Sequence, residues 1–338
     1  MACPVCRGEQ SRPVPLRSTE VALVRCRACR LVHWGRVWAS GDVKAYYHAY
    51  YTGKPVAPDA VTQKRYHAIL SGFERRLGGP KRILDVGCGL GHFLAVAEAR
   101  GWEASGIEVS RSAVDAVEAQ KTANGWTFRM VQGTLEEAPF VPGSFEVLTL
   151  FEVLEHLSDP CKLLACAHEL LTPGGLLYLT TPNFDSLPRW LLGGDWRIIT
   201  PEHLCLFTPG TLRGCLSAAG FSPAWVRTKN VDVPEVWLKL RRRMAGQPQP
   251  TETGTTPQAG SAKEVPGAEG ERPTTGEATQ AFRHTVESSP WLRAAKVGVN
   301  GVLRLAQAGE TIDALAVKKP QHAAIPAFRR EVLSAVVD

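Results

Sequence analysis

Three features of the sequence predict an α/β fold. It should have a doubly wound, mostly parallel sheet and a small N-terminal unit that contains four cysteines. In residues 83–91 a buried strand runs into three glycines at alternate positions, and a helical pattern follows at once. Apolar strands then alternate with amphipathic helices as far as Thr180. Two Cys-x-x-Cys motifs lie between Cys3 and Cys29, with the spacing of a zinc ribbon.

The length and charge of the chain indicate how many domains it holds and argue against nucleic-acid binding. Its 338 residues give room for one large α/β domain and a small accessory unit. The formal net charge is +6, but the basic residues are scattered except for Arg241-Arg242-Arg243, which we interpret as a solvated face. We therefore expect no nucleic-acid partner. No apolar segment reaches the roughly 20 residues that cross a bilayer, and no signal peptide is visible, so we expect a cytoplasmic protein without a membrane span.

The N-terminal cysteines predict a structural zinc site in a ribbon at residues 1–40. Each Cys-x-x-Cys turn points two thiolates at one centre, and four thiolates complete a closed tetrahedral shell. The four ligands would be Cys3, Cys6, Cys26 and Cys29. The alternative is a redox pair, and His33 would be a bystander because four sulfurs already fill the shell. The other cysteines lack such spacing and are interpreted as small core residues: Cys88, Cys161, Cys166, Cys205 and Cys215.

Apolar periodicity and capping residues place the elements of the α/β domain. We predict strands that end at Val86 and Glu108, and strands at 128–131, 145–150, 176–180, 223–230 and 311–318. We predict helices at 64–77, directly after the glycines, and from Ser110, Asp159, Thr208 and Ser289. The helix from Asp159 should include Leu171 and end at Pro173-Gly174-Gly175. Strands separated by helices imply right-handed crossovers and a mostly parallel sheet.

Residues 246–288 have a different composition. They are rich in Pro, Gly, Thr, Glu and Gln and contain almost no aromatic or branched apolar side chains. Such a segment cannot bury enough apolar surface to offset the entropy of ordering it. We therefore predict that it is disordered.

The glycine stretch favours a ligand without phosphates. Dinucleotide-binding folds use G-x-G-x-x-G, whereas here the third glycine comes one residue early and His92 stands in its expected place. Glu108 ends the next strand, where its carboxylate could accept two hydrogen bonds from a ribose diol. The alternative is a structural glycine turn in some other α/β domain.

Residues 83–91 resemble motif I of the class I S-adenosylmethionine (SAM) methyltransferases, whose pattern is close to hhDhGxGxG with h apolar. The resemblance covers about residues 40–245 and 289–320. It implies a Rossmann-like sheet of seven strands, with strand 311–318 inserted antiparallel. It also implies a methyltransferase domain over residues 41–320, with 246–288 as an insertion inside it and 321–338 as a C-terminal tail.

The resemblance implies which residues contact SAM. These are Asp85, Gly87, Cys88, Gly89, Gly91, Glu108, Val109, Thr134, Leu135 and Phe151. Thr134 departs from the family, which commonly has an Asp there, and this weakens one expected contact to the adenine. The tyrosine-rich segment 46–51 either packs the ribbon onto the main domain or, by resemblance, forms part of a lid over SAM.

A Glu-x-x-Glu-His segment marks the expected reaction site after the fourth strand. If Glu152 begins a helical turn, Glu155 and His156 share its face, and His203 follows the fifth strand. Carboxylates and imidazoles that converge in this way suit a divalent cation. The alternatives are a histidine base without a metal, and a purely structural role.

This segment resembles the ubiquinone-pathway O-methyltransferases and the 2′-O-methyltransferases of small-RNA 3′ ends. In the latter, four such side chains hold Mg²⁺, and by resemblance that role falls on Glu152, Glu155, His156 and His203. The ribbon resembles that of bacterial methyltransferases, some of which are sugar C-methyltransferases.

We expect SAM-dependent methyl transfer to a hydroxyl of a small molecule, such as a sugar or a quinone-like phenol, with or without a divalent cation. The alternatives are sugar C-methylation with a histidine base, RNA 2′-O-methylation or ribbon-mediated binding, and an inactive SAM-fold scaffold. The acceptor pocket should come from the Tyr46 region, residues 184–200 and the helix after Ser289. In residues 184–200, Trp190 and Trp196 suggest an apolar or ring-shaped acceptor.

Overall fold

The protein is described by a computed structural model over residues 2–16, 22–35, 60–231, 233–245, 285 and 288–319. The tyrosine-rich segment 46–51, nearly all of the segment 246–288 and the tail 321–338 lie outside these residues, so the predictions for them stay predictions. Within the described part of the chain, no helix combines the length and apolar character needed to cross a membrane.

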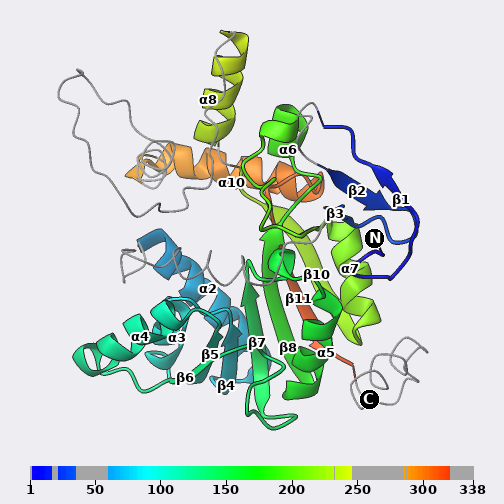
Figure 1. The fold of residues 1–338 in the computed structure, drawn as a ribbon. Helices are drawn as coiled ribbons and strands as arrows, with labels where there is room; N and C mark the ends of the chain where they lie inside the picture. The colour runs from blue at the N-terminus through cyan, green and yellow to red at the C-terminus, as the bar shows by residue number, and fades with distance from the viewer. Residues whose placement is uncertain are drawn as a thin grey trace, which may run out of the picture.

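The main sheet has seven strands in the order β10-β11-β8-β7-β4-β5-β6, which confirms the predicted fold (Figure 1). Its strands are β4 (Arg82–Val86), β5 (Glu103–Glu108), β6 (Arg129–Gln132), β7 (Phe145–Phe151), β8 (Leu171–Pro182), β10 (Phe221–Lys229) and β11 (Thr311–Lys318). Strands β6, β5, β4, β7 and β8 pair in parallel, whereas β11 pairs antiparallel with both β8 and β10. The chain builds β5 and β6 on one side of β4 and then β7 and β8 on the other, so the strand order reverses between β4 and β7.

Helices cover both faces of this sheet (Figure 1). They are α2 (Ala60–Leu77), α3 (His92–Glu98), α4 (Arg111–Asn124), α5 (Pro160–Leu170), α6 (Leu187–Leu192), α7 (Pro209–Ala218), α8 (Val233–Met244) and α10 (Pro290–Leu305), with short 3₁₀ turns η1 (Leu154–His156) and η2 (Gly193–Asp195). Ile83 and Val147 face α2, α3 and α4, while Leu84 and Leu148 face α5 and α7. The apolar residues therefore alternate between two cores, as a sheet buried on both faces requires.

The predicted helix starts are confirmed. Ser110, Asp159, Thr208 and Ser289 each accept a hydrogen bond from a backbone N–H in the first turn of α4, α5, α7 and α10. These caps satisfy donors that have no partner within the helix, which is why short polar residues mark these positions in the sequence.

The predicted end of α5 is wrong. The helix ends at Leu170, and Leu171 already belongs to β8, where it pairs with Phe145 of β7. The pairing resumes at Val147 and Leu176 beyond a register shift, so Pro173-Gly174-Gly175 lies inside the strand. A bulge absorbs the residues that would otherwise break the strand.

A second, four-stranded sheet joins the N-terminal ribbon to the main domain. Its order is β1 (Ser11–Pro13), β2 (Leu23–Cys26), β3 (Val32–Trp34) and β9 (Cys205–Leu206). Strand β9 comes from the far part of the chain and pairs antiparallel with β3. Neither β9 nor helices α6 and α8 were predicted from the sequence.

Gly309 joins three strands where β8 and β10 end and β11 begins. Its N–H donates to Thr228 Oγ1 at 3.1 Å, and its carbonyl accepts from Asn183 Nδ2 at 2.8 Å. A Cβ atom at this position would lie 2.5 Å from the backbone nitrogen and 2.7 Å from the carbonyl oxygen of Lys229.

Gly309→Ala should therefore lower the free energy of unfolding by about 2 kcal/mol or more, because backbone atoms cannot move aside as a flexible side chain can. Urea denaturation measures the change. Gly214→Ala is the matched control, because it lies within α7 with no atom in reach of the new methyl group; there we expect a gain of about 0.5 kcal/mol. Equal unfolding midpoints for Gly309→Ala and the native protein would contradict this account of the junction.

Candidate functional site

The carboxyl ends of β4, β5, β6 and β7 gather the residues expected to bind the cofactor. Parallel pairing sets Val86 beside both Ile107 and Leu150, and Glu108 beside Gln132, so these strands end at one edge of the sheet. The reversal of strand order between β4 and β7 lies in the middle of this edge. Ligands of doubly wound sheets bind at such a point.

The glycine turn after β4 is held close to neighbouring backbone. Gly87, Gly89 and Gly91 all have positive φ, at 71°, 53° and 71°, a region that other residues rarely adopt. The amide groups of Gly87 and Cys88 donate to the carbonyl of Ile107 at 2.8 and 3.1 Å. A Cβ atom on Gly87 would lie 2.7 Å from a methyl group of Val153, so the turn has room only for glycine.

Glu108 is fixed at this turn by two backbone donors. Its carboxylate accepts from Gly89 N at 2.9 Å and from Ser110 N at 2.8 Å, with one oxygen for each. Burial raises the pKa of Glu108, and these backbone donors oppose the shift. Each oxygen keeps a lone pair for a further donor, which fits the predicted contact to a ribose diol.

Asp85 is buried at the end of β4. Thr149 Oγ1 donates to its carboxylate at 2.7 Å. Burial raises the pKa of Asp85 to about 7, Thr149 opposes the shift, and the charge of Glu108 adds to it. Two buried carboxylates thus lie beside the glycine turn, where a cationic ligand would stabilise both.

The other predicted cofactor residues differ in how they can contribute. Val109 is well exposed after β5, and Phe151 is half-buried with its ring 4.9 Å from that of Phe93. Thr134 and Leu135 follow β6, where Thr134 Oγ1 donates to Glu137 and Leu135 is buried. The Cys88 thiol lies 3.7 Å from the sulfur of Met130, inside the domain. Only the backbone of Cys88 is therefore available to a ligand at the glycine turn.

Glu155, His156 and His203 converge beyond the ends of β7 and β8. One ligand atom from each lies within 4.8 Å of the others. Glu155 is 1% exposed; Thr181 Oγ1 donates to its Oε2 at 2.9 Å, while its Oε1 is buried without a hydrogen-bond partner. Burial raises the pKa of Glu155 well above its usual value, and the nearby charge of Glu152 adds to the shift.

Both imidazoles of this cluster are held in one tautomer. His156 Nδ1 lies 3.0 Å from the carbonyl of Glu202, and His203 Nδ1 lies 2.6 Å from the carbonyl of Ile198. A carbonyl only accepts, so each Nδ1 carries the hydrogen and each neutral ring keeps a lone pair on Nε2. Burial lowers the pKa of both rings, that of His156 to about 3.

Glu152 does not begin the helical turn expected for it. Its φ is 54°, and its N–H donates to the carbonyl of Thr180 at 3.0 Å, so the chain turns sharply at the end of β7. The 3₁₀ turn η1 begins only at Leu154. Glu152 is exposed and lies outside the group formed by the other three side chains, although its charge reaches Glu155.

The groups that orient the cluster were not predicted from the sequence. Thr181 holds Glu155, and the carbonyls of Ile198 and Glu202 hold the two histidines. Thr181-Pro182-Asn183 marks the exit of β8 in the sequence, but no pattern there points to the hydroxyl of Thr181. Trp196, which was expected near the acceptor, is buried in the core, where its Nε1 donates to Glu310 at 2.9 Å.

The four N-terminal cysteines also converge. Their sulfurs lie within 4.8 Å of one another, with Cys3 and Cys29 at 3.4 Å and Cys6 and Cys26 at 3.5 Å. A tetrahedral zinc site places its sulfurs about 3.8 Å apart, so this donor set fits zinc. The hydrogen bond from Cys29 lowers the pKa of Cys3 to about 4, which favours a thiolate there.

The ribbon is bonded to the loop that carries His203. His33 pairs with Cys205 in the β3–β9 register, and Trp34 N donates to the carbonyl of Leu204 at 3.3 Å. Trp34 Nε1 donates to the carbonyl of Thr200 at 3.1 Å. The position of His203 thus depends on the ribbon as well as on the main sheet.

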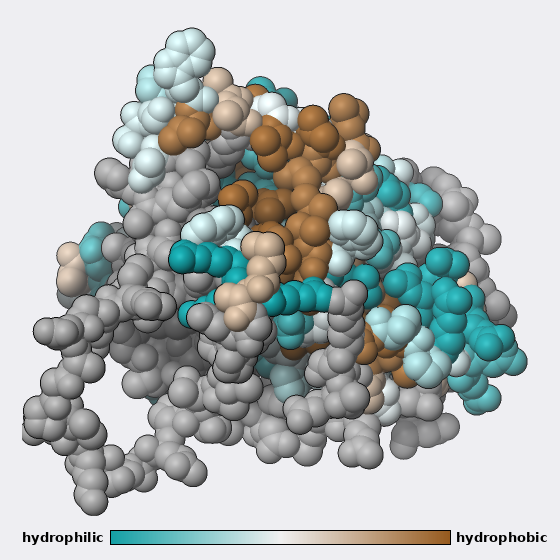
Figure 2. Space-filling view, turned by 90° about the horizontal axis from the view of Figure 1, so that it is seen from above, coloured by the Kyte–Doolittle hydropathy of each residue, from teal (hydrophilic) through white to brown (hydrophobic). Residues whose placement is uncertain are grey.

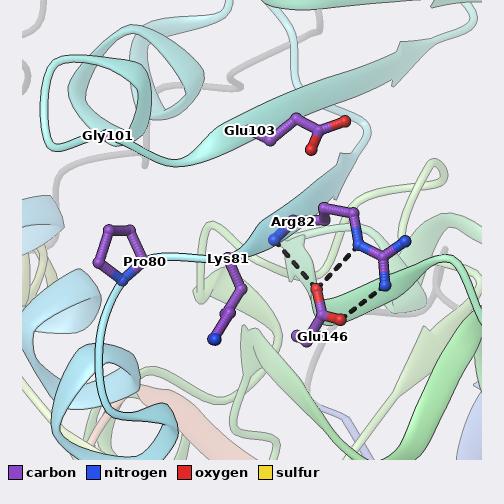
Figure 3. A pocket seen from close by; sticks show the side chains of 6 residues that line it. All are labelled: Pro80, Lys81, Arg82, Gly101, Glu103 and Glu146. Atoms are coloured by element: carbon purple, nitrogen blue, oxygen red, sulfur yellow. Dashed lines mark hydrogen bonds and ion pairs between the residues drawn. The ribbon is translucent and has the colours of Figure 1, made fainter.

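A shallow hollow at the opposite edge of the sheet is a weaker candidate (Figure 3). It is lined by Pro80, Lys81, Arg82, Gly101, Glu103 and Glu146. Arg82 donates to Glu146 through two side-chain hydrogen bonds at 3.1 and 2.7 Å, so the two charged groups in the middle of the hollow already pair with each other. The hollow also lies at the amino ends of the strands, away from the glycine turn.

Comparisons with known proteins identify the family of the chain. A family model described as a methyltransferase domain matches residues 61–224. A ubiquinone biosynthesis O-methyltransferase of Pseudomonas aeruginosa is 34% identical over 160 residues, which cover 46% of this chain and 66% of that protein, just under two thirds of its length. One from Paraburkholderia phymatum is 30% identical over 169 residues, or 48% of this chain and 69% of that protein. A SAM-dependent methyltransferase structure from Archaeoglobus fulgidus has a TM-score of 0.44 and 18% identity, covering 75% of this chain and 94% of that one.

Proposed function

Because this chain belongs to the class I SAM-dependent methyltransferases, we propose that it transfers the methyl group of SAM to a hydroxyl of a small-molecule acceptor. One observation carries the proposal: buried Glu155 and half-buried His156 and His203 form a cluster beyond the ends of β7 and β8, next to the cofactor edge. The names of the curated relatives support O-methylation, and sugars and quinone-like phenols are the acceptor classes that we propose.

The glycine turn and Glu108 would bind and orient SAM. SAM supplies a methyl group already activated on a sulfonium, so the protein mainly has to align the reactants. Glu108 would accept hydrogen bonds from the ribose hydroxyls while its backbone donors keep it in place. The buried carboxylate of Asp85 would add negative potential close to the positive sulfur.

The Nε2 atom of His156 or His203 would receive the proton of the acceptor hydroxyl. In this step the acceptor oxygen forms a bond to the methyl carbon, the carbon–sulfur bond breaks, and the hydroxyl proton moves to Nε2. The Nδ1–H bonds to the carbonyls of Glu202 and Ile198 keep each ring in the tautomer that can accept it. Burial lowers the pKa of both rings, which keeps them neutral before the transfer but also weakens them as bases.

The same three side chains could hold a divalent cation. Glu155 Oε1 is buried without a hydrogen-bond partner, and two neutral imidazoles lie next to it, so the donor set fits a divalent transition-metal cation better than Mg²⁺, which prefers oxygen ligands. A bound cation would act as a Lewis acid on the acceptor oxygen. Glu152 could join only by a change in the chain around its left-handed backbone.

We also propose that the four cysteines hold a structural zinc ion. The buried apolar side chains of the ribbon pack into clusters shared with the main domain, so a metal would take the place of a separate core. Because β3 pairs with β9, the ion would also stabilise the loop that carries His203.

Glu108→Gln should weaken SAM binding at least tenfold, because the amide nitrogen replaces one of two oxygens, each of which accepts from a backbone N–H and would also accept from the ribose. Isothermal titration calorimetry with SAM measures the affinity, and circular dichroism confirms that the variant is folded. Glu118→Gln on the exposed side of α4 is the control and should bind SAM normally. An unchanged affinity in a folded Glu108→Gln variant would overturn the assignment of the cofactor site.

Replacing His203 or His156 by alanine should reduce kcat by about 10²- to 10⁴-fold while SAM affinity stays the same, because the proton loses its acceptor. Transfer of radiolabelled methyl groups to a panel of phenols and hydroxylated sugars measures turnover. His67→Ala, at an exposed position on α2, is the control.

Titration with Mn²⁺ tests the cation. Binding to the native protein and to His67→Ala, but not to His203→Ala or Glu155→Gln, would support it. Turnover that survives chelation would instead leave a histidine base without a metal. Solvent deuterium uptake at an acceptor carbon would favour C-methylation over O-methylation.

Native mass spectrometry should find one zinc ion in the purified protein and none in Cys26→Ser, which loses one of four ligands. Cys166→Ser is the control, because Cys166 lies on α5 outside the cluster. The zinc-free protein should also have a lower Tm. A zinc-free native protein with an unchanged Tm would show that the cluster is not a structural metal site.

A further inference from the structure

Helices α6, α8 and α10 each carry one exposed tryptophan. They are Trp190, Trp237 and Trp291, with exposed fractions of 74%, 59% and 86%. Every other tryptophan in the described part of the chain is buried or half-buried. Exposed indole rings are costly in water, and these helices lie at one end of the molecule (Figure 1), so this end is a candidate interaction surface.

Helix α10 exposes most of its apolar residues. Among its large apolar side chains only Leu303 is buried, whereas Val297, Val299, Val302 and Leu305 are exposed. Figure 2, which looks at the molecule from above, shows apolar (brown) side chains gathered in one area with hydrophilic (teal) ones next to it. Helices α6, α8 and α10 lie at this end of the molecule in Figure 1.

Helices α8 and α10 together have a formal charge equal to the net charge of the whole chain. The sequence of α8 has four basic residues and one acid, and that of α10 has three basic residues and no acid. Together they have a formal charge of +6, equal to that of the whole chain, so the rest of the protein is neutral overall. The guanidinium of Arg241 lies 5.3 Å from the ring centre of Trp237, so charge and indole occur side by side.

We propose that α6, α8 and α10 form a docking surface for an anionic lipid bilayer. Tryptophans, branched apolar residues and a strong excess of lysine and arginine on surface helices are the composition of elements that lie in the membrane interface. A second copy of the chain is a poorer occupant, because two such surfaces would bring like charges together. The headgroups of anionic lipids would satisfy the charge while the apolar side chains enter the bilayer.

The surface lies above the carboxyl end of β8, close to the proposed reaction site. Leu187 N at the start of α6 donates to the carbonyl of Ala308, which follows α10, at 2.9 Å. Asn183, at the exit of β8, donates to the carbonyls of Gln307 and Gly309. Docking would therefore bring the acceptor site to the bilayer, which favours an amphipathic acceptor; this last step rests on the proposed function, whereas the docking surface does not.

Flotation with phosphatidylglycerol vesicles and with phosphatidylcholine vesicles tests the surface on the full chain. The native protein should float with the anionic vesicles, less so at high salt, and poorly with the neutral ones. The triple variant Arg241→Glu, Arg242→Glu, Arg243→Glu and the double variant Trp237→Ala, Trp291→Ala should each lose at least tenfold in vesicle affinity. Their SAM affinity should stay unchanged, which shows that they are folded.

The matched control is Arg75→Glu, Arg76→Glu, two exposed neighbouring arginines at the end of α2, which should float like the native protein. Glu108→Gln should also float normally, so failure of the cofactor assignment and failure of the docking surface give different results. The proposal is overturned if the native protein ignores anionic vesicles, or if the control variant loses binding equally. It is also overturned if sedimentation shows a dimer that the tryptophan substitutions dissociate while vesicle binding is absent.

Discussion

The parallel hydrogen bonding of β5, β4, β7 and β8 is the constraint on which the candidate site depends. Parallel strands run in one direction, so all their carboxyl ends meet at one edge. That edge receives the glycine turn from β4, Glu108 from β5, and Thr181 from β8. Groups far apart in the sequence therefore become neighbours without any long side chain having to reach across the sheet.

This edge concentrates buried carboxylates. Asp85, Glu108 and Glu155 are each less than 4% exposed, and burial raises the pKa of all three. Removing a carboxylate from water is unfavourable unless hydrogen bonds or a positive charge compensate. Backbone and threonine donors compensate in part. A sulfonium next to Asp85 and Glu108, and a cation or an acceptor proton next to Glu155, would supply the rest, so the electrostatics of the folded chain favour positively charged ligands.

The ribbon contributes to this edge through one short strand. Two residues of β9 pair with β3, directly after His203, and Trp34 bonds to the loop on the other side of that histidine. The small sheet beside the four cysteines is thereby hydrogen-bonded to the loop that carries His203. The position of His203 therefore depends on how the ribbon packs against this loop.

Local chemistry in the sequence was enough to place the glycine turn, the four helix caps, the seven main strands and the four-cysteine cluster, because each depends on residues that are near one another or on a regular period. It misplaced the end of α5, since the pairing of Leu171 with Phe145 outweighs the breaking effect of Pro173. It also misassigned Trp196, whose burial depends on the distant Glu310. The sequence by itself determined which residues could do the chemistry. Only the tertiary structure decided that Glu155, His156 and His203 meet without Glu152, because a carbonyl of β8 fixes the backbone of Glu152 in a left-handed turn and so sets the direction of the chain that follows.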